Sequence, residues 1–239
     1  MRPTRGGSGA GGKLACMTEL PPPTLDDATR NRAELALCGL MAYRELTAFE
    51  RLSSDARFSP TIIDRVALAR LAVHEFGHYE RVVEVITARG AEPADSMEPF
   101  VASIDALHDR TRPGDWYESL MKAHVIDSVS GDFYVAISRG LDPDIRRLVQ
   151  EVQALDEQNK WLHERLQEAL QEDPRLASRL ALWGRRLLGE ALTQARRIAE
   201  SGLFNDALIT PDGEEPLSVL FSELVENHSR RMAALGLTA

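Results

Sequence analysis

The chain lacks several features that mark particular classes of protein. Only two cysteines occur among 239 residues, Cys16 in a Gly-rich leader and Cys38 on an apolar stripe, so a disulfide framework is not expected. No run of about 18 uncharged apolar residues exists, so no transmembrane helix is expected. The formal net charge of −9 argues against a strongly basic nucleic-acid binder, although it leaves room for a local basic patch. These absences favour a cytoplasmic protein.

Residues 1–24 have the composition of a disordered N-terminal tail. Glycine dominates residues 6–12, and no hydrophobic segment separates the basic start from Cys16, so the segment fits neither a secretory nor a lipoprotein signal. The run Pro21–Pro23 then predicts a short, stiff spacer. Met1 and Met17 both fit as the start of the chain.

From Leu25 onward almost every segment has a helical period, and no segment has the alternation of a strand. The second long helix is expected to begin with Ser59 as its N-cap and Pro60 at its first position, and to end at Gly90. Helices of such length in a soluble chain usually belong to bundles. We predict four long helices, over residues 26–53, 60–89, 115–139 and 142–171. Between the second and the third we expect a linker over 91–99 and a short apolar piece over 100–107. Two further helices are expected over 174–201 and 216–235.

Two polar residues lie on the core-facing stripe of the second predicted helix. Glu75 and His78 are three residues apart and share a face that is otherwise apolar. Burying a carboxylate and an imidazole costs on the order of several kcal/mol unless a partner, a proton or a metal compensates. Glu45 interrupts the apolar stripe of the first predicted helix in the same way. The 30 residues between Glu45 and Glu75 suit an up-down helix pair. Asp127 lies within the third helix.

These residues allow two interpretations. In carboxylate-bridged di-iron bundles, two helices each supply a Glu and two others each supply Glu-x-x-His. Oxygen ligands then bridge the irons and imidazoles cap them. Alternatively, Glu75 and His78 form a satisfied polar cluster with a charged His78 against Glu45. Glu-x-x-His is frequent by chance, so the metal hypothesis depends on the joint placement of these residues. His74, His108 and His228 are expected at the surface or at an edge.

Several stretches resemble a known family. Residues 71–83 and 86–93 look like the second helix of the tRNA hydroxylase family called MiaE, and residues 45–52 and 180–194 make the chain resemble more closely an actinobacterial MiaE-like group of ferritin-like-fold proteins. The resemblance covers about residues 25–239. It implies an all-α protein with a ferritin-like four-helix bundle over 25–172, two additional C-terminal helices over 173–239 packed on it, and an iron centre of one or two ions.

The same resemblance implies an activity and a set of ligands. In MiaE the reaction is dioxygen-dependent hydroxylation of the isoprenoid side chain of a modified tRNA adenosine. Carried over by motif, Glu45 would be the ligand from the first helix, Glu75 and His78 the pair from the second, and Asp127 the carboxylate from the third.

The fourth helix departs from the family pattern, which has an acid followed three residues later by His. The candidate pairs are Asp156 with Asn159, Glu157 with Lys160, and Leu155 with Gln158, and none is complete. His163 shares a face with Asp156 but is expected too far along the axis. A single-metal site and a metal-free bundle are therefore alternatives to the di-iron hypothesis.

Two further alternatives concern partners. A non-catalytic ferritin-like bundle would act as a structural or interaction protein, with a homodimer formed through the C-terminal helices. Arg185 and Arg186 in the fifth predicted helix are candidates for contacting tRNA, although arginines at this density are more often an ion-paired, solvated face. A regulator of the TetR type would need a basic helix-turn-helix in the first 50 residues, where the sequence has a Gly-rich tail and an acidic helix.

Overall fold

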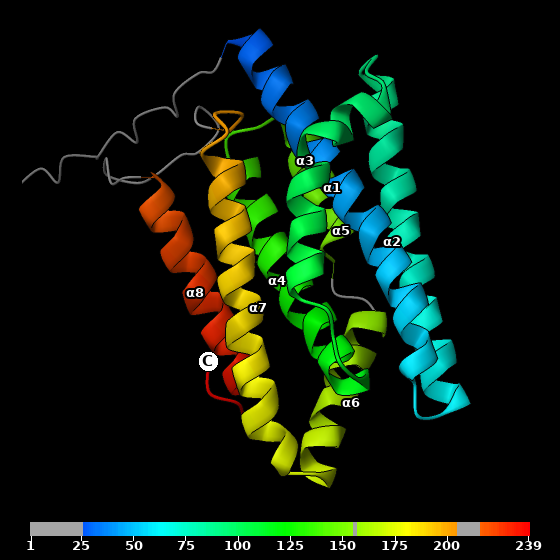
Figure 1. Ribbon diagram of the computed structural model, residues 1–239. Helices are drawn as coiled ribbons and strands as arrows, with labels where there is room; N and C mark the ends of the chain where they lie inside the picture. The colour runs from blue at the N-terminus through cyan, green and yellow to red at the C-terminus, as the bar shows by residue number, and fades with distance from the viewer. Residues whose placement is uncertain (1–25, 155–156, 205–215) are drawn as a thin grey trace, which may run out of the picture.

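The computed structural model describes residues 26–154, 157–204 and 216–239, and their regular structure is helical throughout (Figure 1). The predicted all-α class is therefore confirmed. None of the helices in these described ranges has the length and hydropathy that crossing a membrane requires. The elements in the described part are α1 Asp27–Asp55, the 3-10 turn η1 Ala56–Phe58, α2 Ile62–Ala88, α3 Pro93–Arg110, α4 Trp116–Ser138, α5 Pro143–Val152, α6 Glu157–Glu172, α7 Arg175–Ala199 and α8 Pro216–Ala234.

Side-chain caps fix where the long helices begin. The Asp26 carboxylate accepts a hydrogen bond from the Thr29 backbone N–H at 3.0 Å and so starts α1. The predicted N-cap of α2 was wrong: α2 begins at Ile62, and the Thr61 hydroxyl accepts from the Asp64 N–H at 3.0 Å. Thr61 also donates to the Asp64 carboxylate at 2.8 Å, a reciprocal contact that Ser59 does not make. The predicted end is confirmed, since Gly90 has a φ of +76°.

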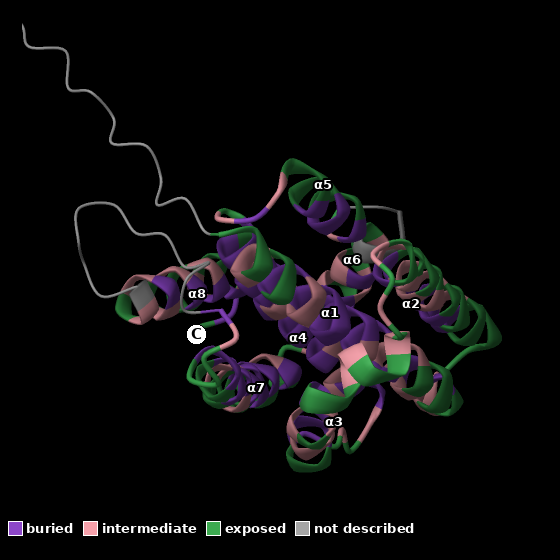
Figure 2. Ribbon diagram, turned by 90° about the horizontal axis from the view of Figure 1, so that it is seen from above, coloured by how far each residue is buried: buried purple, intermediate pink, exposed green. Residues whose placement is uncertain are grey.

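Helices α1 and α4 occupy the middle of the molecule. α1 packs along most of α2 and also contacts α3 and α4, while α4 contacts α5, α6, α7 and α8. Seen from above, buried residues concentrate on α1 and α4 and on the faces that the outer helices turn towards them (Figure 2). At Gly39 the two backbones of α1 and α3 come so close that a Cβ would overlap the Ser96 carbonyl.

Two predicted elements differ from the structure. The linker and short apolar piece form one 18-residue helix, α3, which starts with Pro93 and packs the buried side chains of Phe100, Ile104 and Leu107 in the protein core. The single helix predicted over 142–171 is instead two helices, α5 and α6. α5 ends where the Gln153 side chain lies in the space that a Cβ on Gly131 of α4 would fill, so the missing side chain on α4 accommodates the turn.

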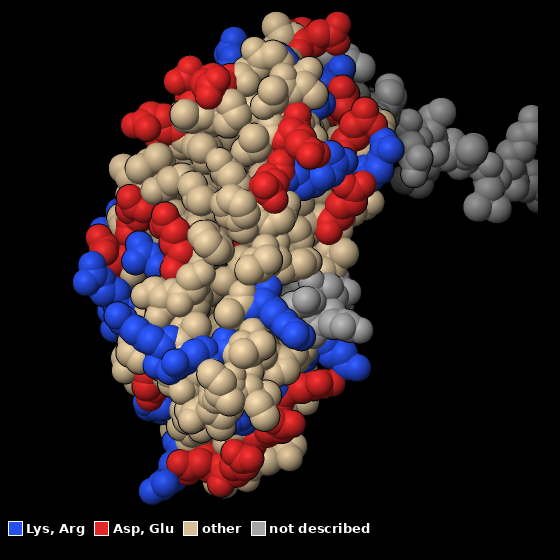
Figure 3. Space-filling model, turned by 90° about the vertical axis from the view of Figure 1, so that its right-hand side faces the viewer, with Lys and Arg blue, Asp and Glu red and all other residues tan. Residues whose placement is uncertain are grey.

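The predicted core stripes are confirmed for most helices. α4 is buried on most sides, as its apolar composition indicated, although Val135 is 41% exposed. α7 buries the predicted face: Leu176, Leu180, Trp183, Leu187 and Ala191. The predicted tail over residues 1–24 lies outside the described residues. From the α2 side, acidic and basic side chains are interspersed around uncharged surface (Figure 3).

Candidate metal centre

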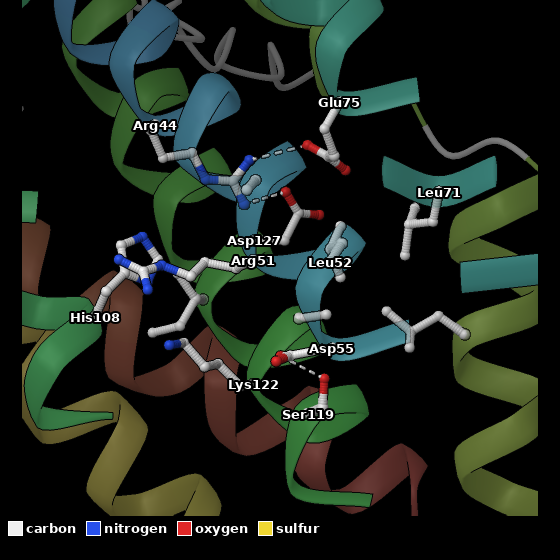
Figure 4. Close-up of a pocket in the computed structure, with 14 residues that line it drawn as sticks. Arg44, Arg51, Leu52, Asp55, Leu71, Glu75, His108, Ser119, Lys122 and Asp127 are labelled. Carbon is white, nitrogen blue, oxygen red and sulfur yellow. Dashed lines mark hydrogen bonds and ion pairs between the residues drawn. The ribbon is translucent and has the colours of Figure 1, made fainter. Parts of the chain in front are cut away.

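The structure brings the four predicted ligands together, with an arginine among them. Glu45 and Arg44 come from α1, Glu75 from α2 and Asp127 from α4. Nη1 of Arg44 donates to Glu45 Oε2 at 2.9 Å and to Glu75 Oε2 at 3.4 Å. Nη2 donates to Asp127 Oδ1 at 2.6 Å (Figure 4). His78 Nδ1 lies 4.0 Å from Glu45 Oε2.

Arg44 compensates the burial of these carboxylates. Glu45 is fully buried and Glu75 is 6% exposed, so each needs a partner. Burial alone would lower the pKa of Arg44, but the carboxylates of Glu45, Asp127 and Glu75 outweigh it and raise that pKa well above its usual value. The guanidinium therefore stays charged and supplies inside the bundle the positive charge that a metal ion would otherwise bring.

Burial shifts the pKa of Glu75 and the pKa of His78 each in the direction that favours the neutral form. Burial, followed by the charge of Glu45 and a hydrogen bond with it, raises the pKa of Glu75 well above its usual range. Burial lowers the pKa of His78, and the nearby Glu45 carboxylate only partly opposes this. A neutral imidazole is the form that binds a metal, whereas Glu75 must release a proton to do so.

A tighter group of ligands lies on α2 itself. His74, Glu75 and His78 each offer one ligand atom, and these atoms all lie within 4.8 Å of one another. The rings of His74 and His78, one helical turn apart, have centroids 4.1 Å apart. Two ligands of one ion such as zinc, each at about 2.0–2.2 Å, lie at most about 4.4 Å apart. Small side-chain rotations therefore suffice for these three residues to hold one ion.

The donor chemistry does not fit two ions equally well. The three carboxylates of the predicted set, Glu45, Glu75 and Asp127, all accept hydrogen bonds from the Arg44 guanidinium. A second cation among Glu45, Glu75 and Asp127 would have to displace Arg44. The group on α2 shares only Glu75 with Arg44, across 3.4 Å, so the residues present fit one ion better than two.

A large cavity opens beside this group. Its volume is about 1140 Å³, and Glu75, His78 and Asp127 lie on its wall with His124 of α4 and His163 of α6. His163 thus borders the same space as Glu75 and His78, although it does not belong to the group within 4.8 Å. Burial lowers the pKa of His124 to about 4, helped by nearby His163, and its Nε2 is buried without a hydrogen-bond partner.

Sequence reasoning missed Arg44 and His74. Arg44 follows Leu37 and Met41 at helical spacing, so the apolar stripe of α1 already pointed it inward. His74 was expected at the surface or at an edge and is partly exposed, but its place beside Glu75 and His78 as a possible ligand was not foreseen. The same expectation was wrong for His108 and His228, which are 6% and 2% exposed.

Most candidate ligands of the fourth predicted helix lie outside the part of the chain whose side chains are described. Asp156 lies outside the described residues, and the structure does not describe the side chains of Glu157, Gln158 and Asn159. Lys160 and His163 are described, and both lie on the cavity wall.

Comparison with known families agrees with this architecture. The model of a family described as "Ferritin-like domain, actinomycetes" matches residues 28–211. The chain belongs to this family. The match spans the bundle that carries Glu45, Glu75, His78 and Asp127. A search of curated proteins finds no match to the chain.

Proposed function

We propose that this ferritin-like protein holds one iron ion through His74, Glu75 and His78 and hydroxylates an organic substrate with dioxygen. The observation that carries the proposal is the convergence of two imidazoles and one carboxylate beside a cavity of about 1140 Å³. Two His and one carboxylate with open positions are typical of non-haem Fe(II) oxygenases. Such an ion supplies the binding and reduction of dioxygen.

The remaining residues would prepare the site for that ion. Arg44 pairs most closely with Glu45 and Asp127 and reaches Glu75 only at 3.4 Å, so Glu75 would exchange that longer contact for the metal. A hydroxylation places one oxygen atom of dioxygen in a C–H bond and releases the other as water, so an external reductant must supply two electrons and two protons. The di-iron hypothesis, with Glu45 and Asp127 as further ligands, stays a prediction and requires Arg44 to move.

For the substrate, we propose the modified tRNA adenosine that the resemblance to MiaE implies. The cavity is larger than the roughly 300–1,000 Å³ of typical small-molecule pockets, which suits a nucleoside with a side chain. The arginines of α7 offer less support, because they are engaged within the protein. Arg186 donates to the Arg110 carbonyl at 2.8 Å, and Arg185 to the Thr238 carbonyl at 3.2 Å.

The test is a single-turnover reaction. Protein loaded anaerobically with Fe(II) is mixed with tRNA carrying an isoprenoid-modified adenosine, with ascorbate as the reductant that supplies two electrons, and then with dioxygen. Mass spectrometry of the digested tRNA should show a gain of one oxygen atom in the modified nucleoside. His78→Ala should abolish the product. Oxygen uptake above that of the metal-free protein with the same reductant, but without a hydroxylated nucleoside, would reject this substrate. No uptake above that control by a fully iron-loaded protein would reject the oxygenase.

Arg44 also supports a second candidate, a non-catalytic ferritin-like interaction protein. Its ion pairs compensate the buried acids without a metal, so the bundle does not need one to be stable. Exposed apolar side chains lie on the C-terminal helices, with Leu182 64% and Val225 41% exposed. If these helices form a homodimer, light scattering should give twice the chain mass, and Leu182→Glu should return it to one. A monomer in both cases would reject this dimer.

A further inference from the structure

A second, smaller cavity of about 50 Å³ lies among α1, α3 and α4, with α2 and α6 completing its wall (Figure 4). Besides Arg44, the wall includes three basic side chains from three different helices: Arg51 of α1, His108 of α3 and Lys122 of α4. None of the three belongs to the proposed metal site. Asp55 and Ser119 complete the same side of the wall.

Two of these basic residues are buried or half-buried cations without a partner. Lys122 is only 7% exposed, yet it makes no hydrogen bond or ion pair with any described residue. Arg51 also makes none, and its Nε is buried. Burial lowers the pKa of Lys122 to about 8, against the opposing effect of Asp55. Unpaired buried cations are costly, so the protein carries a charge here that its own side chains do not balance.

The acids on the wall are already engaged. Asp127 and Glu75 accept hydrogen bonds from Arg44. Asp55 accepts from the Ser119 hydroxyl at 2.7 Å. Asp55 is therefore the one carboxylate among the described lining residues that is not paired with Arg44, and its charge acts on Lys122. Asp109, which does not line the cavity, also acts on Arg51 and Lys122 but is paired with Arg112 at 2.7 Å. These two acids balance at most two of the three cations Arg51, Lys122 and Arg112, so at least one positive charge stays uncompensated.

His108 presents a hydrogen-bonding atom to the same region. The Thr47 hydroxyl donates to the Arg44 carbonyl at 2.9 Å, so it can only accept from His108 Nε2, which lies 3.2 Å away. Nε2 therefore carries the proton and Nδ1 the lone pair. Nδ1 is buried and has no partner. It can accept a hydrogen bond from the hydroxyl of a protonated oxyanion.

We propose that this cavity binds a small oxyanion, a carboxylate or a phosphate, at Arg51 and Lys122, and that His108 Nδ1 accepts a further hydrogen bond where the anion carries a hydroxyl, as hydrogen phosphate does. One water needs about 10–15 Å³ of such volume, so the space of about 50 Å³ suits a few waters or one small oxyanion. The planar guanidinium of Arg51 can donate two parallel hydrogen bonds to either group, and the Lys122 ammonium adds a point charge. The proposal is independent of a metal ion.

The test measures anion-dependent stability of the full chain in EDTA, which keeps metal ions out of the experiment. Melting temperatures are recorded against sodium phosphate and sodium acetate, with sodium chloride holding the ionic strength constant, and calorimetric titration gives the Kd. A saturable rise is expected with at least one oxyanion. Arg51→Gln and Lys122→Met should each weaken the Kd at least tenfold, while the exposed control Arg70→Gln should leave it unchanged.

Each outcome decides the proposal. A response to phosphate alone identifies a phosphate site, and a response to acetate alone identifies a carboxylate site. No saturable response to either, or the same response in Arg51→Gln and Arg70→Gln, overturns it. Equal binding of chloride overturns the preference for oxyanions. If Lys122→Met fails to fold, Arg51→Gln still decides the question, because Arg51 makes no hydrogen bond or ion pair with a described residue that its replacement would break.

Discussion

The Arg44 guanidinium on α1 donates to the Asp127 carboxylate on α4 across 2.6 Å. This ion pair joins the two central helices at the level of the candidate metal centre. The other nitrogen of the same guanidinium reaches Glu45 and Glu75, so one cation from α1 ties together the acids of α1, α2 and α4.

Removing that cation should destabilise the bundle. Arg44→Met keeps the length of the side chain but leaves Glu45 and Asp127 without their partner, and breaking a buried pair typically costs about 3–5 kcal/mol. In urea unfolding of the metal-free protein, the free energy of unfolding of Arg44→Met should fall by about this amount. The surface substitution Arg70→Gln should lower it by about 0.5 kcal/mol or less. An unchanged free energy of unfolding would show that Arg44 does not compensate the acids.

Addition of a divalent metal should partly restore the stability of Arg44→Met, because the freed carboxylates then have a cation to bind. The wild-type protein should gain less from the same metal concentration. This comparison separates an electrostatic role of Arg44 from a packing role, since a packing defect would not respond to metal.

The close approach of α1 and α3 predicts a second stability effect. A Cβ at Gly39 would overlap the backbone carbonyl of Ser96, which cannot rotate away. Gly39→Ala should therefore cost about 1–3 kcal/mol, as overpacking does. Gly189→Ala on α7 is the matched control: nothing lies within 4 Å of its Cβ position, so it should stabilise by about 0.5–1 kcal/mol. Equal effects of the two substitutions would contradict the close packing.

The features that follow from the hydrophobic periodicity of the helices were predictable from the sequence. The stripe of α2 placed Glu75 in the core, and the composition of α4 marked a buried helix. The break between α5 and α6 was not predictable, because it depends on Gln153 meeting Gly131 from another helix. Arg44 was missed although its spacing from Leu37 and Met41 pointed it inward, because a charge next to Glu45 is ordinary on a surface and its partner Asp127 comes from α4.

His108 predicts a loss of stability in acid. Burial, followed by the charges of Lys122, Arg51 and Arg44, lowers its pKa to about 2 in the folded protein. The unfolded chain, with a pKa near 6.5, therefore takes up a proton first, and stability present above about pH 6.5 is lost as the pH falls towards 2. Between pH 7 and pH 5 this amounts to about 2 kcal/mol.

His108→Gln keeps a donor for Thr47 and removes the titration. Denaturant unfolding at pH 7 and pH 5 should show a correspondingly smaller loss in this variant than in the wild type. His124, with a pKa lowered to about 4, contributes in the same direction and remains in both proteins. Identical losses in the two proteins would contradict a neutral, buried His108.

Lys122 predicts a change in stability at alkaline pH. Its pKa is about 8 in the folded protein, so below pH 8 the buried charge costs stability, and that cost disappears as the pH rises from 8 to about 10.5. In chloride buffer at pH 7, Lys122→Met should stabilise by about 1–3 kcal/mol. The difference from the wild type should shrink above pH 10. A destabilised variant would show that Lys122 has a partner in that buffer.

The most direct test of the proposed centre is the number of metal ions per chain after anaerobic titration with Fe(II), measured by calorimetry and elemental analysis. We expect one ion, lost in His74→Ala and in His78→Ala and retained in Asp127→Asn. Two ions per chain, with one of them lost in Asp127→Asn and neither in His74→Ala, would contradict the mononuclear site and restore the di-iron hypothesis.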